Sequence, residues 1–124
     1  MHPFVMSIEC RQSELPTLRE QLGRWLDAAR VPAECAFQAK LVTHEAAKNA
    51  MSHAGPGDLV KIRAAVEEDD IVIEVLDTNG EPWELDSSNG AEIRGLTLIH
   101  GLARHVETVE QPEGTALVML VGRN

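Results

Sequence analysis

Two polar residues, Glu45 and Asn49, stand four positions apart in a segment whose other residues suit a packed helix. Residues spaced by four lie about 40° apart around a helix, so both share one face with Leu41 and His53. Burying a carboxylate or an amide without partners is costly, and a bound cation or ligand would satisfy both groups. The face therefore indicates either a ligand site or a solvated helix edge, where polar pairs at this spacing are common.

A second polar cluster, Asp77-Thr78-Asn79-Gly80, directly follows the apolar run 71–76. An Asp at the exposed end of a buried strand can accept a hydrogen bond from a ligand amine. The same four residues also suit a turn that caps the strand. Taken alone, the cluster leaves both interpretations open.

Two further short segments suit either phosphate binding or turn formation. Arg94-Gly95-Leu96 is expected to open a helix after a loop that contains Gly and Asp. Free N–H groups at a helix start bind phosphate, and an Arg beside them adds a charge-assisted donor. Gly114-Thr115 leads into the final predicted strand and is compatible with a simple turn. Each segment is a weak signal by itself.

Hydrophobic spacing and turn residues predict the elements that must position these groups. In chain order they are a strand over 4–9, an amphipathic helix with Ser13 as its N-cap, a helix over about 33–54, strands over 60–66 and 71–76, a polar irregular stretch over 77–94, a short helix over 95–103, and strands over 106–110 and 116–121. The strands are predicted to pair as hairpins and do not alternate with helices. This order favours an α+β fold, a two-layer sandwich of mostly antiparallel sheet with helices on one face.

Length and composition limit the classes of protein. The 124 residues are expected to form a single domain over 1–124. Asp and Glu number 20 against 11 Lys and Arg, and the net charge of −9 argues against nucleic acid or an anionic membrane as partner. The sequence shows neither a membrane span nor a signal peptide, so a cytoplasmic location is expected. Cys10 and Cys35 fit that location as reduced thiols.

Together and in this order, these segments resemble the nucleotide-binding boxes of the histidine-kinase-like (GHKL) ATPase superfamily. Within it, they are most similar to the anti-sigma factor/serine-protein kinase family of bacterial partner-switching. Residues from Glu45 to His53 match the pattern E-A-x-x-N-A-x-x-H at every fixed position. The second box is 75–80 and the third is 94–99, with Thr115 at the start of the last strand. The likeness covers nearly the whole chain and implies the Bergerat-type α/β sandwich.

The resemblance implies ATP and Mg²⁺ as cofactors and a role for each candidate residue. Glu45 would be the catalytic base that orients or deprotonates the attacking hydroxyl. Asn49 would hold Mg²⁺ against the ATP phosphates. Asp77 would accept the adenine amino group, with Thr115 supporting it. The other implied nucleotide-binding residues, which lie in the second and third boxes beside a lid over about 84–93, are Asn79, Gly80, Arg94, Gly95 and Leu96.

The implied function is that of an anti-sigma factor and serine/threonine-protein kinase. Such a protein phosphorylates a STAS-type anti-sigma factor antagonist and sequesters a sigma factor, and the likeness also suggests a homodimer. Two departures favour an alternative, a non-catalytic protein-binding regulator of the same fold with weak or lost ATP binding. Asn79 stands at a glycine position of the second box, and Ile93 at the first glycine of the third. The intact Glu45, Asn49 and Asp77 favour the kinase.

Overall fold

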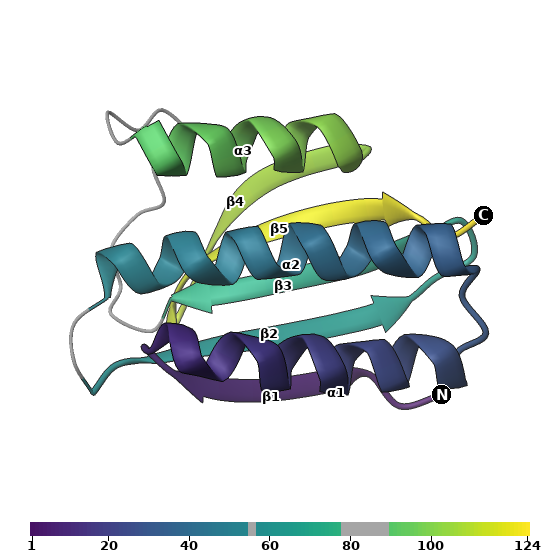
Figure 1. The fold of residues 1–124 in the computed structure, drawn as a ribbon, viewed down its shortest axis with the longest axis horizontal. Helices are drawn as coiled ribbons and strands as arrows, with labels where there is room; N and C mark the ends of the chain where they lie inside the picture. Colours follow the sequence, from purple (N-terminus) through teal and green to yellow (C-terminus); the bar gives the residue numbers. More distant parts are fainter. Residues whose placement is uncertain (55–56, 78–89) are drawn as a thin grey trace.

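The computed structural model describes residues 1–54, 57–77 and 90–124, with the backbone alone for 90–93. In these residues, five strands form one sheet and three α-helices pack against it (Figure 1). The elements in chain order are β1 (Phe4–Glu9), a short 3-10 helix (η1, Gln12–Glu14), α1 (Leu15–Ala28), α2 (Ala33–His53), β2 (Leu59–Val66), β3 (Asp70–Asp77), α3 (Gly90–Leu102), β4 (His105–Gln111) and β5 (Gly114–Gly122).

The strands lie in the order β1-β2-β3-β5-β4, and every neighbouring pair is antiparallel. The predicted hairpin of β2 and β3 is confirmed, with Val66 opposite Ile71 next to the acidic residues 67–70. β5 lies between β3 and β4, which brings Thr115 opposite Asp77. The chain therefore has the α+β fold expected from its sequence.

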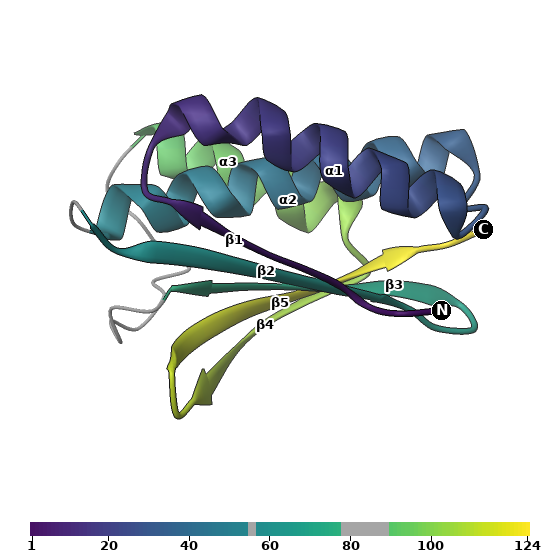
Figure 2. The ribbon, with the colours of Figure 1, turned by 90° about the horizontal axis from the view of Figure 1, so that it is seen from below.

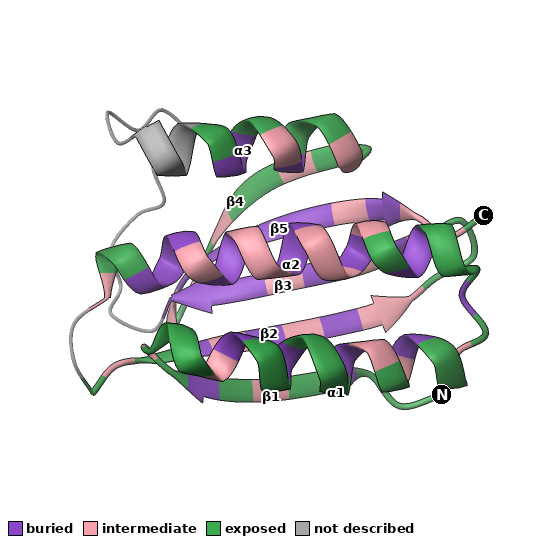
Figure 3. Cartoon of the chain, viewed as in Figure 1, coloured by how far each residue is buried: buried purple, intermediate pink, exposed green. Residues whose placement is uncertain are grey.

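All three α-helices lie on the same face of the sheet (Figure 2). α2 lies between α1 and α3 and contacts both of them (Figure 1). The outward side of α1 is largely exposed, whereas much of α2 is buried or half-buried (Figure 3). α2 is therefore the central helix of its layer, and it presents one flank to each neighbouring helix.

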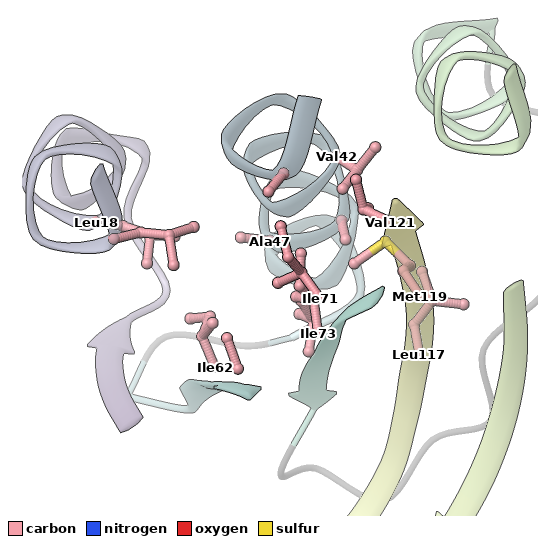
Figure 4. Packing of buried hydrophobic residues seen from close by; sticks show 14 of the residues in the cluster. Leu18, Val42, Ala47, Ile62, Ile71, Ile73, Leu117, Met119 and Val121 are labelled. Carbon is pink, nitrogen blue, oxygen red and sulfur yellow. The ribbon is translucent and has the colours of Figure 1, made fainter. Parts of the chain in front are cut away.

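The core between the two layers combines one stripe of each helix with the inner face of the sheet. α1 is the amphipathic helix that the sequence predicts, and its leucines point inward at spacings of three and four. α2 faces the sheet with alanines, so it can pack close to Ile71 and Ile73 of β3 (Figure 4). Because packed interiors leave few voids, this contact holds the polar residues of α2 in defined positions. The fully buried alanines are Ala39, Ala46, Ala47 and Ala50.

The start of α1 differs from the sequence-based expectation. Ser13 lies within η1, and α1 begins two residues later, at Leu15, so the predicted Ser13 cap is wrong. Pro16 occupies the first turn of α1, where its missing N–H group costs no helical hydrogen bond. The position of this proline, rather than the polar side chain before it, marks the helix start.

α3 also begins earlier than the sequence predicts. It starts at Gly90 instead of Gly95, because Ala, Glu and Arg between these glycines are good helix formers. The irregular stretch expected over 77–94 is shorter at both ends, since Asp77 belongs to β3. Three features of the sequence analysis lie outside the described residues: Asn79, Gly80 and most of the lid expected over 84–93.

The described residues contain no helix with the length and apolar character that crossing a membrane requires. Cys10 and Cys35 both carry free thiols, as the sequence analysis expected. Cys35 is buried in the core, and Cys10 is half-buried at the end of β1.

Candidate functional site

Glu45 and Asn49 lie on the flank of α2 that contacts α3. A Cβ atom built on Gly95 would lie 2.9 Å from Glu45 Oε2 and 3.2 Å from Asn49 Nδ2. Both distances are shorter than ordinary Cβ contacts, so a glycine at this position lets the acid and the amide lie against the α3 backbone. The structure thus brings together residues from the first and third sequence boxes.

The carboxamide of Asn49 carries the clearest sign of a missing partner. Asn49 is 5% exposed, and within the described residues its Nδ2 atom is buried without a hydrogen-bond partner. An unsatisfied buried donor costs about 1–3 kcal/mol, so native proteins leave few of them. Rotation of the carboxamide can turn either its N–H donors or its oxygen into the site. The group therefore suits an anionic oxygen or a hard cation.

Asp77 and Thr115 form a second polar pair at one end of the sheet. They face each other across β3 and β5, and Val60 of β2 is the other neighbour of Asp77. Asp77 is 3% exposed and shares the helix-facing side of its strand with Val75 and Ile73. The carboxylate that was expected at an exposed strand end is therefore buried. This setting suits a specific acceptor for a ligand donor.

Cys10 is a site neighbour that the sequence analysis did not single out. Its thiol donates a hydrogen bond to the backbone oxygen of Met51 on α2, at 3.1 Å. Burial and the negative charges of Asp58 and Asp77 raise the pKa of the Cys10 thiol, so the sulfur lies within the electrostatic reach of Asp77. Cys10 also lines a cavity of about 380 Å³, together with Glu9, Arg11, Met51, Ala54 and Gly57.

The remaining candidates of the third box are the two chain neighbours of Gly95. Arg94 is exposed, and Leu96 is buried in the hydrophobic core. Because α3 begins at Gly90, the free N–H groups of its start belong to 90–93 and not to Gly95. The expectation that Gly95 offers a free backbone N–H is therefore wrong, and its observed contribution is the close approach to Glu45.

Comparisons with known proteins identify a family and a similar fold. Residues 8–121 match a family model described as the histidine kinase-like ATPase domain. A solved structure, the histidine kinase domain from Erythrobacter litoralis EL346 blue-light activated histidine kinase, has a TM-score of 0.59 at 18% sequence identity. The alignment covers 94% of this chain and 62% of that chain, so this chain spans less than two thirds of the solved domain.

At this level of identity, the structural match speaks for the fold alone. No curated protein matches this chain at a significant level. The family model, in contrast, covers most of the sequence and includes Glu45, Asn49, Asp77, Gly95 and Thr115. The chain therefore belongs to the histidine kinase-like ATPase domain family.

Proposed function

We propose that this chain binds ATP with Mg²⁺ and transfers the γ-phosphoryl group to a serine or threonine hydroxyl of a partner protein. The observation that carries the proposal is Asn49, a buried carboxamide whose Nδ2 has no partner in the described residues. This group lies against Gly95 of α3 and one helical turn from Glu45. Membership of the family supports the nucleotide as the missing partner.

The residues present fit such a ligand. Asn49 would hold Mg²⁺ through Oδ1, since this cation takes few protein oxygens and keeps water and phosphate ligands. Asp77 would accept a hydrogen bond from the adenine amino group, with Thr115 beside it. When bound, Mg²⁺ neutralises negative charge on the transferring phosphoryl group. Asn49 would thus contact the phosphate end of the nucleotide through Mg²⁺, and Asp77 would contact its adenine base.

Glu45 is the general base in this proposal. Its carboxylate is half-buried and is kept beside Asn49 by the packing of α2 against α3. It orients the acceptor hydroxyl and takes its proton as the hydroxyl oxygen bonds to phosphorus and the bond to the ADP oxygen breaks. The proton then passes from Glu45 to solvent, which restores the carboxylate for the next turnover.

The partner we propose is a STAS-type anti-sigma factor antagonist, and the chain would sequester a sigma factor as a cytoplasmic homodimer. This assignment is supported by the full E-A-x-x-N-A-x-x-H pattern between Glu45 and His53 and by the order of the boxes. A non-catalytic regulator of the same fold is the second candidate, because Asn79 and Ile93 depart from the glycines of the two later boxes.

Calorimetric titration of Asn49→Ala tests the nucleotide and metal together. We expect the wild type to bind ATP more tightly with Mg²⁺ than with EDTA, and Asn49→Ala to lose this difference because the oxygen ligand is gone. The affinity for Mg-ATP should fall at least about tenfold, or about 1.4 kcal/mol. The exposed Asn124→Ala is the matched control. An unchanged Mg²⁺ effect in Asn49→Ala contradicts the metal assignment.

Phosphate-transfer and binding assays on the wild-type protein distinguish the two candidate functions. Transfer of labelled phosphate from ATP to a serine or threonine of the antagonist supports the kinase. Binding of the antagonist without any heat of ATP binding and without transfer supports the non-catalytic regulator instead.

Gly95→Ala tests the close approach of α3 to the site. The new methyl group displaces the Glu45 carboxylate and crowds Asn49, so Mg-ATP affinity should fall about threefold to tenfold. Stability should stay within about 1 kcal/mol of the wild type, because the clash is offset by the better helix propensity of alanine. Calorimetry and thermal unfolding measure the two effects separately.

Gly101→Ala is the matched control in the same helix. A Cβ atom there meets nothing within 4 Å in the described structure, so only the helix propensity changes. We expect its Mg-ATP affinity to equal that of the wild type. Equal affinities for Gly95→Ala and Gly101→Ala would show that the α3 contact does not shape the site.

A further inference from the structure

A groove separate from the Asp77 end of the site runs between α1 and α2. Its volume is about 540 Å³, and it is lined by Arg19 and Glu20 of α1 and by residues of α2 between Phe37 and Glu45. Glu45 lines this groove, and its carboxylate also lies against Gly95 of α3. A chain bound along the groove would pass next to the proposed catalytic base.

Basic side chains lie in and beside the groove, on a protein whose net charge is −9. Lys40, His44 and Lys48 recur every four residues on α2, so they share one face of the helix. The Arg19 guanidinium of α1 lies 2.9 Å from His44 Nδ1. In the described part of the chain, neither Arg19 nor the two lysines form an ion pair. These cations are available to an outside partner.

The groove also contains two acidic residues, Glu20 and Glu45. Glu20 Oε1 lies 2.7 Å from Arg24 Nη2 and is already paired. At His44, burial and the Arg19 cation lower the pKa, and Lys48 lowers it further, against the opposing effect of Glu45. Burial is the largest of these influences, and the lowered pKa means that the imidazole of His44 adds little positive charge of its own to the groove.

Phe37 adds an apolar contact beside these cations. Its side chain is 60% exposed at the edge of the groove, three residues before Lys40 on α2. An exposed aromatic ring beside cationic groups is typical of a protein-binding surface. The ring becomes buried when the partner binds, and the charged groups surround the contact. The complementary ligand carries an apolar side chain among carboxylates.

We infer that this groove binds an acidic segment of the protein substrate, with an apolar side chain on Phe37 and carboxylates on Arg19 and Lys40. The inference rests on the proposed kinase function, because a segment held here delivers a neighbouring hydroxyl to Glu45. The net negative charge of the protein repels an acidic partner elsewhere on the surface, which favours binding at the groove.

Fluorescence anisotropy with synthetic peptides tests the groove. The probe is a labelled peptide of Glu, Leu and Ser, and its comparison peptide has Gln in place of every Glu. We expect Lys40→Glu to weaken binding of the acidic peptide about tenfold, with a smaller loss at high salt, because ionic strength screens the contacts. The matched control Lys61→Glu makes the same charge change on β2 and should bind within about twofold of the wild type.

Two results would overturn the groove assignment. One is equal weakening by Lys40→Glu and Lys61→Glu, which would reflect net charge alone. The other is equal binding of the Gln peptide. Mg-ATP calorimetry on the same samples separates this inference from the proposed function. If the wild type binds the acidic peptide at Lys40 but does not bind Mg-ATP, the groove assignment stands and the kinase proposal fails.

The titration of His44 gives an independent readout in the wild type. Carboxylates bound beside Arg19 and Lys48 stabilise the charged imidazole, so the acidic peptide should raise the pKa of His44 from its lowered value. The Gln peptide should leave this pKa unchanged. Histidine NMR spectra recorded across pH measure the shift, and no shift with the acidic peptide overturns the assignment.

Discussion

Asp77→Asn is expected to abolish ATP binding while the domain stays folded. The substitution keeps the shape of the side chain but removes its negative charge and one of its two acceptor oxygens, so the adenine amino group meets either a donor or a weaker, neutral acceptor. Asp77 is buried between β2 and β5, so water does not compensate the lost hydrogen bond. The affinity should fall at least about 100-fold, the equivalent of about 2.7 kcal/mol. Calorimetry with Mg-ATP measures this loss.

The other end of the same strand provides the control. Asp70 begins β3, and its Oδ1 atom lies 2.6 Å from Arg104 Nη1 near the surface. Asp70→Asn makes the same chemical change and weakens only this exposed ion pair, which contributes at most about 1 kcal/mol to stability. We expect its ATP affinity to match the wild type. An Asp77→Asn variant that binds ATP as tightly as Asp70→Asn contradicts the adenine assignment.

Glu45→Gln should separate ATP binding from phosphoryl transfer. Glutamine keeps the size of the side chain and its contact with Gly95, so Mg-ATP affinity should change little. It cannot take the proton of the acceptor hydroxyl, and loss of a general base lowers the rate by about 10²–10⁴-fold. Single-turnover transfer of labelled phosphate to the antagonist, at saturating ATP, measures the effect.

Glu34→Gln is the matched control for this experiment. Glu34 lies in the first turn of the same helix and is exposed, far along α2 from Asn49. Its transfer rate should equal that of the wild type. If Glu45→Gln transfers phosphate at the same rate as Glu34→Gln, the carboxylate of Glu45 is not the base.

Much of the fold could be predicted because it depends on local periodicity. The leucines of α1 repeat at helical spacing, and the strands of the β2–β3 hairpin flank a short acidic turn. The errors fall where a helix begins, since Ser13 offered a plausible cap and Gly95 a plausible first residue. Neither spacing nor composition shows how far good helix formers extend a helix beyond its periodic core.

Local spacing also predicted one part of the candidate site, the helix face that Glu45 and Asn49 share. Glu45 and Asn49 share a helix face by spacing alone, and the structure confirms that this face meets a neighbouring element. The identity of that element could not be predicted, because the approach of Gly95 depends on how α3 packs against α2. The closeness of Cys10 to Asp77 likewise depends on pairing across three strands.

The place of β5 in the sheet has a consequence for synthesis on the ribosome. Among the described elements β5 leaves the ribosome last, yet it lies between β3 and β4 and supplies the neighbour of Asp77. Pairings between distant segments form late, and until then the apolar edge of β3 is open to wrong partners. The pairing of Asp77 with Thr115 therefore forms only after β5 has emerged, whereas α2 can form earlier in the nascent chain.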